Sequence, residues 1–355
     1  MIATLTPSSL SSSFRHPAVI ASLAALAAAG VGLLLVVGAG STPAAAGGAL
    51  VEGMFATPYA IGSSLNTAAV LALIATGFTV AHRAGLVNVG GEGQLCAGGV
   101  AGAAAGLALP AATPPVLAVS AVLAAGCAAG ALWAWLAGLL LVRRGTSEVI
   151  TTLLLNFVGI GLLSLAVHEE ALLRQPATST ETLPQSEPLP AAARLPLLGS
   201  VESPATAVTV VALVAAAVTA LVLHRSATGL RLRAVGHSRA ASLRLGAPVD
   251  RLRAGSLAVA GGFAGVAGAA LVATAPYVLA EHFSSGYGFS GLVVGLLARG
   301  SLTAVVGVSL LFGFLTNGGI SLQLASGVPA SSVQIVQSLL VLFIAASMLW
   351  KEKRP

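Results

Sequence analysis

Three groups of polar residues interrupt an otherwise apolar sequence and could do chemistry. In the first, Gly85–Gln94, three polar side chains (Asn88, Glu92 and Gln94) stand among four glycines. Amides and carboxylates can hydrogen-bond the hydroxyls and ring nitrogens of a small solute. Inside a membrane they need protein or water partners, so the backbone here must turn within protein or at the interface. An ordinary interfacial loop has the same composition, and both interpretations stay open.

The second group lies on a predicted helix over residues 147–167. Ser147 is expected to be its N-cap, and Glu148 suits the positive end of the helix dipole. Asn156 lies about 12 Å deeper along the helix, where its side chain must bond another helix or line an aqueous path. An aromatic ring beside it could stack on a nucleobase or sugar. The predicted substrate pathway comprises Asn66, Asn88, Glu92, Asn156 and Phe157.

The third group is the segment 225–255, which holds seven arginines against Asp250 alone. Its balance of +6 equals the net charge of the whole chain. By the positive-inside rule this segment is cytoplasmic. Leucines alternate with the arginines, and residues 238–245 are expected to form a two-turn amphipathic helix. Such a helix suits either a membrane surface or the groove of a cytoplasmic partner.

Other kinds of chemistry have little support. Lysine occurs only at Lys351 and Lys353, so no Walker A motif is present, and no zinc-protease or nucleophile-elbow motif occurs. The cysteines, Cys96 and Cys127, lie far apart in apolar runs, without the spacing of a redox pair or metal site. We expect no enzyme activity, no metal and no cofactor in this chain. Because one loop accounts for the entire net charge of +6, no nucleic-acid partner is expected either.

Membrane-spanning helices must position these groups. Of the 355 residues, 56% are apolar and 8% are charged, whereas a soluble domain carries about 25% charged residues. We predict an all-α polytopic integral membrane protein of about ten membrane segments, nine full spans plus one short or broken segment. The apolar runs lie at about 18–40, 60–81, 89–109, 115–142, 147–167, 205–223, 256–275, 287–298, 302–320 and 333–350. The short segment is 287–298.

Counting spans from the basic segment places both termini in the cytoplasm. The same count predicts that residues 168–204 form an external loop. This loop holds five glutamates against two arginines. A cleaved signal peptide within residues 1–46 is an alternative, but its apolar stretch exceeds the usual ~7–15 residues, so we expect a retained first span. Glycines four apart, at 98, 102 and 106 and at 261 and 265, predict close helix packing. Residues 1–355 are expected to form one transmembrane domain.

The motifs, and their order along the chain, resemble those of the permease subunits of bacterial ABC importers for nucleosides and simple sugars. These subunits belong to the branched-chain amino-acid and ribose permease superfamily. The resemblance covers residues 60–350 and runs through Gly85–Gln94, Glu148–Asn156, Gly229–Gly236, Gly261–Gly268 and Gly286–Gly291. That family commonly has a proline after the short segment, where this chain reads Ala298-Arg299-Gly300. The helix break there is therefore expected to rest on glycine alone.

The resemblance implies a multi-pass protein of the bacterial plasma membrane, in contact with lipid, that pairs with a sister permease or a second copy. It also implies cytoplasmic ATP-binding subunits, which hold the ATP, and an extracytoplasmic substrate-binding protein. The basic segment then corresponds to the coupling helix of the family. The predicted ATPase-coupling residues are Gly229, Arg231, Arg233, Gly236, Arg239, Arg244 and Gly246.

We therefore expect a permease that imports a nucleoside or simple sugar by alternating access, driven by a separate ATPase subunit. A branched-chain amino acid is the third choice of substrate. An ion-coupled secondary transporter for a small polar solute is the alternative, but Glu92 and Glu148 map near the cytoplasmic ends of helices rather than at the midplane. A membrane scaffold whose basic loop recruits a partner or anionic lipid is a further alternative.

Overall fold

The computed structural model describes residues 30–110, 112–176, 183–199, 202–329, 331–336 and 338–339. Contacts divide the chain into two compact units. The larger unit runs from Gly62 to Gly313, and the smaller takes in the described residues up to Ile61 and from Phe314 onward. The single domain expected over residues 1–355 stays a prediction.

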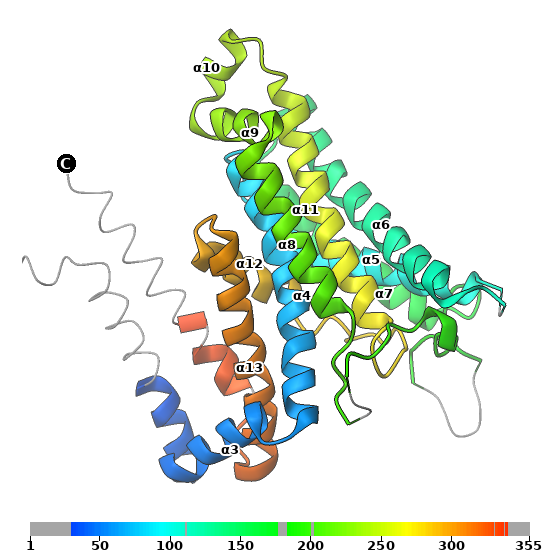
Figure 1. The fold of residues 1–355 in the computed structure, drawn as a ribbon, viewed down its shortest axis with the longest axis vertical. Coiled ribbons are helices and arrows are strands. Elements are labelled where there is room, and N and C mark those ends of the chain that lie inside the picture. Colours follow the sequence, from blue (N-terminus) through cyan, green and yellow to red (C-terminus); the bar gives the residue numbers. More distant parts are fainter. Residues whose placement is uncertain are drawn as a thin grey trace, which may run out of the picture. The chain divides into compact units, whose positions relative to one another are not determined.

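The described part of the chain is helical apart from its connections and three isolated β-bridges (Figure 1). Among the described residues, six helices are long and apolar enough to cross a membrane, or seven if the bent pair Gly30–Gly38 and Pro43–Phe55 counts as one span. The all-helical prediction is confirmed, while the count of ten segments stays a prediction. The helices are α3 (Pro43–Phe55), α4 (Pro58–Arg83), α5 (Gly91–Ala108), α6 (Pro115–Arg144), α7 (Glu148–His168), α8 (Val208–Arg225), α9 (Ala227–His237), α10 (Arg239–Arg244), α11 (Val249–Val272), α12 (Tyr287–Ala298) and α13 (Leu302–Ser326), with a short 3₁₀ turn at Ala191–Ala193.

Eight of the predicted apolar runs correspond to helices α4 to α8 and α11 to α13. The short run 287–298 has the same bounds as α12. Most of the runs 18–40 and 333–350 lies outside the described residues. Ser147 stands at the N-cap position of α7, but its side chain makes no cap hydrogen bond.

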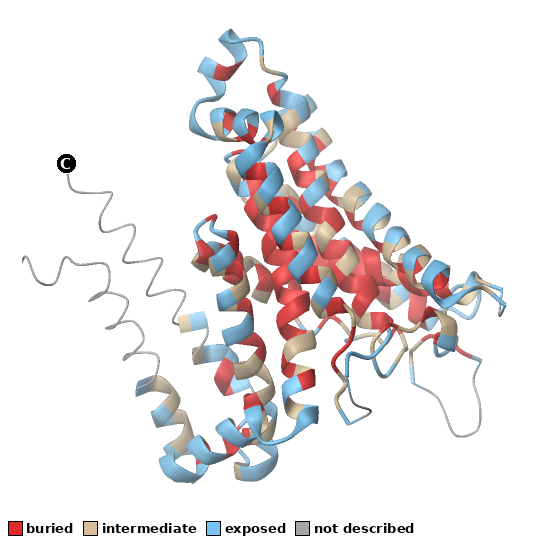
Figure 2. Ribbon diagram, viewed as in Figure 1, coloured by how far each residue is buried: buried red, intermediate tan, exposed pale blue. Residues whose placement is uncertain are grey.

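The core of the larger unit is formed by α4, α5 and α11. In α4 the most apolar 18-residue window is 89% buried, against 22% in α6 and 28% in α7 and α8. Figure 2 shows the same contrast between buried central helices and exposed outer faces. Lipid is as apolar as leucine, so exposed aliphatic side chains on α6, α7 and α8 carry no penalty in a membrane.

Glycines bring α6 and α11 into backbone contact. A Cβ atom on Gly265 would lie 3.0 Å from the Cα of Gly130 and closer still to the carbonyl oxygen of Gly126. Gly98 of α5 meets the Gly265 backbone in the same way, and Gly261 meets Gly130. The close helix packing predicted for Gly98, Gly261 and Gly265 is confirmed.

In the smaller unit, α3 packs against the end of α13. Phe55 and Phe314 stack with ring centroids 5.0 Å apart. The sequence pattern predicts no helix over residues 43–55. One forms because Gly40 turns the chain with a φ of 79°, Thr42 caps the Ala45 N–H and Pro43 occupies the first helical position. The result is a bend of 107° after Gly38.

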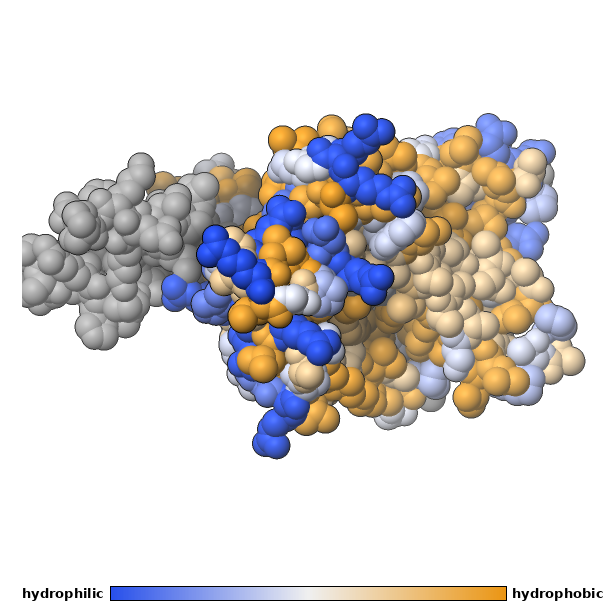
Figure 3. Space-filling view, turned by 90° about the horizontal axis from the view of Figure 1, so that it is seen from above, coloured by the Kyte–Doolittle hydropathy of each residue, from blue (hydrophilic) through white to orange (hydrophobic). Residues whose placement is uncertain are grey.

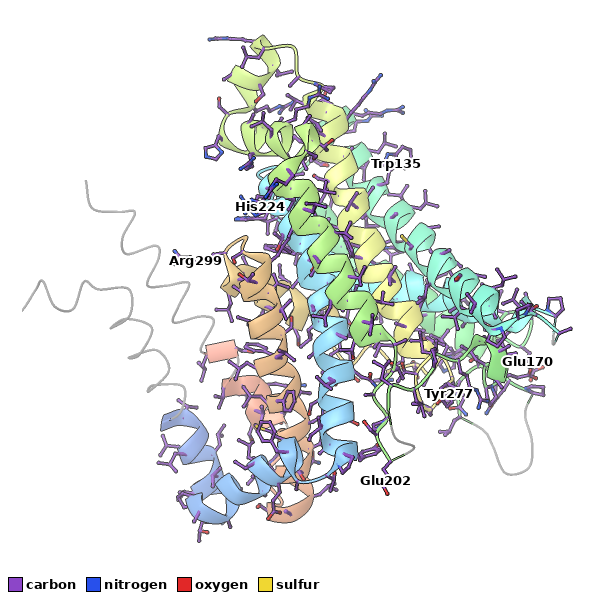
Figure 4. The ribbon with its side chains drawn as sticks, viewed as in Figure 1. Trp135, Glu170, Glu202, His224, Tyr277 and Arg299 are labelled. Atoms are coloured by element: carbon purple, nitrogen blue, oxygen red, sulfur yellow. The ribbon has the colours of Figure 1, made fainter. Side chains whose placement is uncertain are left out.

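The connection between α7 and α8 packs against the segment between α11 and α12. Gln185 bridges Ala280, and the Ser186 hydroxyl accepts a hydrogen bond from the Leu279 N–H at 2.9 Å. Figure 4 shows Glu170, Glu202 and Tyr277 at one end of the larger unit, opposite α9 and α10. The segment rich in glutamates and the segment rich in arginines therefore lie at opposite ends of this unit.

Candidate functional site

A polar network surrounds the start of α5. Asn88 and Gln94 form a reciprocal amide pair, in which each side-chain nitrogen donates to the other's oxygen, at 2.9 and 3.0 Å. The Asn88 Oδ1 also accepts a hydrogen bond from the Gly90 N–H at 3.0 Å. Both side chains are buried. The pair therefore fixes the turn that leads from α4 into α5.

Asn156 of α7 supplies the cap that α5 lacks. The N-cap residue of α5 is Gly90, which has no side chain to accept the free N–H groups of the first turn. Instead, the Asn156 Oδ1 accepts a hydrogen bond from the Gly93 N–H at 2.9 Å, and its Nδ2 donates to the Val89 carbonyl at 2.9 Å. Asn156 is 1% exposed. The predicted partner of this polar side chain is thus the backbone of another helix.

Thr152, one turn before Asn156, joins the same network. Its hydroxyl accepts a hydrogen bond from the Val89 N–H at 3.2 Å and donates to the Glu148 carbonyl at 2.7 Å. Thr152 is not among the site residues predicted from the sequence. The spacing from Thr152 to Asn156 was the available signal, because residues four apart lie on one helix face.

Glu92 lies between two helix N-termini, its own in α5 and that of α12. Its Oε2 accepts a hydrogen bond from the Gly288 N–H at 2.8 Å. The Ser284 hydroxyl and the backbone of Gly286 and Phe289 also hydrogen-bond this carboxylate. Glu92 is 3% exposed. A buried carboxylate is tolerable here because backbone donors and two helix dipoles face it.

Three of the five predicted pathway residues, Asn88, Glu92 and Asn156, therefore gather around one turn. In this structure their hydrogen bonds hold α5, α7 and α12 together. To contact a solute, they would have to exchange these bonds during transport. Their role in a substrate pathway stays a prediction.

The other two predicted pathway residues lie apart from this network. Asn66 of α4 donates to the Pro204 carbonyl at 2.6 Å and accepts from the Thr206 N–H at 2.9 Å. Phe157 is 68% exposed on the outer face of α7. Asn66 thus fastens the segment before α8, and Phe157 presents its ring to the surroundings.

Asn66→Ala is expected to release residues 202–207 without unfolding the helices, because the substitution removes three hydrogen bonds to that segment. Hydrogen exchange of the Thr206 amide should rise at least tenfold, while the amides of α11 keep their protection. Asn66→Asp retains the acceptor for Thr206 and should give a smaller rise. Equal exchange at Thr206 in all three proteins would contradict this role.

A cavity of about 30 Å³ lies between α4, α8 and α13. Its walls are mostly small and aliphatic side chains, with the hydroxyl residues Thr209 and Ser309 among them. A volume of this size accommodates about one water molecule. It is too small for a nucleoside or a sugar.

The basic segment folds into two short helices, each with a serine cap. The Ser226 hydroxyl accepts from the Gly229 N–H at 3.1 Å, and the Ser238 hydroxyl accepts from the Ala241 N–H at 3.3 Å. The helix predicted over residues 238–245 is confirmed as α10. Helix α9 was not predicted, because Gly229 and Gly236 obscured its pattern.

These two glycines are contact residues. The backbone of Leu223 fills the space where Gly229 would carry a Cβ atom, and at Gly236 the Arg83 carbonyl and the Gly85 nitrogen fill it. Leu232 and Val235 are buried beside them. The basic segment is thereby seated on the end of α8 and on the turn after α4.

The outer side of the same segment carries leucines and arginines in alternation. Leu245 is 86% exposed, and Arg239 pairs with Asp250 at 3.6 Å. Arg233 is half-buried, and Gly246 turns the chain with a φ of 77°. Figure 3, which looks onto this end, shows hydrophilic side chains interspersed with hydrophobic ones. We define the α9–α10 surface as Leu230, Arg231, Leu243, Arg244 and Leu245, all of which are exposed.

A surface of exposed leucines flanked by arginines suits an apolar groove with an acidic rim. A partner of this kind would bury the leucines and neutralise the arginines. The coupling role of the predicted residues in this segment stays a prediction.

Comparison with known proteins gives one family and several relatives. The family described as "Branched-chain amino acid transport system / permease component" matches residues 60–345. The guanosine ABC transporter permease protein NupP of Bacillus subtilis is 31% identical over 319 residues, 89% of each chain. The glucose ABC transporter permease protein TsgB13 of Haloferax volcanii is 32% identical over 346 residues, 95% of this chain and 88% of the relative.

The nucleoside ABC transporter permease protein NupB of Lactococcus lactis is 29% identical over 296 residues, 81% of this chain and 80% of the relative. No solved structure matches the chain.

Proposed function

This chain belongs to the family of branched-chain amino acid transport permease components, and from that premise we propose that it imports a nucleoside or a simple sugar as the membrane subunit of an ABC transporter. It is a multi-pass transport subunit of the cell membrane, and the ATP is bound by a separate ATPase subunit. The choice of substrate rests on the relatives that match most of the chain, because their names refer to guanosine, glucose and nucleosides. Despite the family's name, a branched-chain amino acid is therefore a weaker choice.

The proposed topology has ten membrane segments and both termini in the cytoplasm. It is supported by the opposite placement, within the larger unit, of the glutamate-rich connection and the arginine-rich helices α9 and α10. The positive-inside rule then assigns α9 and α10 to the cytoplasm. Substrate arrives at the opposite end from an extracytoplasmic binding protein, and a sister permease or second copy completes the pathway.

The proposed mechanism couples ATP hydrolysis to the polar network. The α9–α10 surface docks on the ATPase subunit, and its buried side rests on the turn after Arg83. That turn leads directly into Asn88 and Glu92. When the ATPase subunits close, the turn shifts, and the hydrogen bonds that Asn88 and Asn156 make to the residues of this turn exchange to pass the substrate.

Capture of the ATPase subunit tests this proposal. We expect a tagged wild-type chain in mild detergent to retain an ATP-binding subunit, and the variant Arg231→Ala/Arg244→Ala/Leu245→Asp to retain less than a tenth as much. These three side chains are exposed, so the fold should be kept. Arg143→Ala/Arg144→Ala is the control, because it removes two exposed arginines from the end of α6. If the triple variant captures as much ATPase as wild type, the docking role is wrong.

A further inference from the structure

Helix α12 is too short to cross a membrane, and left-handed residues interrupt the helical conformation at both of its ends. Its 12 residues extend about 18 Å, against a hydrocarbon core of about 30 Å. Ser285 and Gly286 precede it with φ angles of 42° and 73°, and Arg299 and Gly300 follow it with 52° and 78°. Four left-handed residues thus set α12 apart as a separate segment.

The sequence predicts that glycine alone breaks the helix after Ala298, but Arg299 contributes to the break as well. Arg299 itself adopts a left-handed conformation, which is uncommon for a residue with a side chain. The Arg83 Nη2 donates a hydrogen bond to the Gly300 carbonyl at 2.7 Å. The break is therefore held from another helix, and Arg83 takes part in a contact that the sequence did not reveal.

Both ends of α12 are held by the segment 83–92, which contains the end of α4, the turn after it and the start of α5. At the first end, the Glu92 carboxylate accepts the Gly288 N–H. At the second end, Arg83 bonds Gly300. The charges suit these positions, because a carboxylate favours the N-terminal end of a helix and a guanidinium the C-terminal end. Helix α12 has no charged residue of its own.

Along its length, α12 lies against α4 through glycines. A Cβ atom on Gly291 would lie 2.6 Å from the Ile74 Cβ, and one on Gly295 would lie 2.5 Å from the Phe78 Cδ1. The absence of side chains at these positions lets the helix lie flush on α4. The glycine contacts join α12 to α4, and the two polar bonds and favourable dipoles join it to the segment 83–92.

That segment is also where the basic helices rest. Gly236, at the end of α9, contacts the Arg83 carbonyl and the Gly85 nitrogen. We propose that Arg83 and Glu92 position α12 on the α4–α5 turn, so that a shift of α9 carries α12 with it. Helix α12 is then the element that the ATPase moves. This inference rests on the proposed function, in which the ATPase subunit causes the movement of α9.

The first test separates ATP hydrolysis from transport. In the complex captured by the wild-type chain and reconstituted in vesicles, Arg83→Ala should hydrolyse ATP within about twofold of wild type while uptake of guanosine or glucose falls at least tenfold. Arg83→Lys keeps a donor for the Gly300 carbonyl, so it should recover part of the uptake. Arg299→Gln, which removes an exposed arginine from the same connection, should transport normally.

The second test measures the position of α12 directly, first in the isolated chain and then in the complex with the ATPase. Spin labels at His82→Cys and Arg299→Cys, both exposed positions, are introduced in the Cys96→Ala/Cys127→Ala background. Their distance distribution should be narrow, should stay the same when the complex binds ATP, and should broaden with Arg83→Ala. An equally broad distribution with and without Arg83, or an ATP-dependent change in the wild-type distance, would overturn the proposal.

The two tests distinguish the possible failures. If wild type takes up neither solute, the proposed function fails, and the label distances in the isolated chain still decide the role of Arg83. If wild type transports and the Arg83→Ala variant transports equally well, the positioning role is wrong and the proposed function stands.

Discussion

Asn156→Leu is expected to cost about 2–6 kcal/mol of stability, because it leaves the Gly93 N–H and the Val89 carbonyl unpaired in a buried site, at about 1–3 kcal/mol for each group. Leucine is close to asparagine in size, so the loss comes from hydrogen bonds and not from a cavity. The measurement is thermal unfolding of the purified chain in detergent, read as loss of the monodisperse peak on size exclusion. Transport should be lost as well, since α5 would no longer be fixed to α7.

Asn156→Asp is the matched control for this substitution. A carboxylate can still accept from the Gly93 N–H but cannot donate to the Val89 carbonyl. Its thermal stability should therefore lie between those of wild type and Asn156→Leu. If Asn156→Leu unfolds at the wild-type temperature, the network around α5 does not stabilise the fold.

Gly265→Leu is expected to prevent folding. The position that its Cβ atom would take lies 3.0 Å from the Cα of Gly130 and closer to the Gly126 carbonyl, and backbone atoms cannot rotate away as a side chain can. Overpacking usually costs about 1–3 kcal/mol, and the forced separation of two helices should exceed that range. The yield of monodisperse protein after membrane extraction should fall at least tenfold.

Gly255 provides the control on the same helix. It also lies on α11, but nothing lies within 4 Å of the position of an added Cβ atom. Gly255→Leu should therefore extract like wild type. Normal yields from both variants would mean that α6 and α11 do not pack as described.

Much of the helical framework could be predicted from the sequence, because the apolar runs and the glycine spacings are local signals. The run 287–298 and helix α12 have the same bounds. The bend after Gly38 was missed, because a continuous apolar stretch hides a turn made by Gly40 and a cap made by Thr42. Helix α9 was missed because Gly229 and Gly236 weaken its helix pattern. These glycines allow close backbone contact with the end of α8 and with the turn after α4.

The candidate site could be predicted only in part. Asn88, Glu92 and Asn156 were chosen because polar side chains in an apolar region need partners, and the structure brings all three to one turn. The hydrogen-bond partners of these side chains depend on the tertiary structure, because they are distant in the sequence. Asn156 bonds residues more than sixty positions away, and Arg83 bonds Gly300. Nothing local in the sequence reveals the contact between Arg83 and Gly300.

The source of energy for uptake tests the central claim most directly. The complex captured by the wild-type chain is reconstituted in vesicles, and uptake of labelled guanosine and glucose is measured with ATP supplied to the α9–α10 side. Parallel vesicles receive an ion gradient without ATP. The account predicts uptake of one of these solutes with ATP and none with the gradient alone. Uptake driven by the gradient in the absence of ATP would contradict it and identify a secondary transporter.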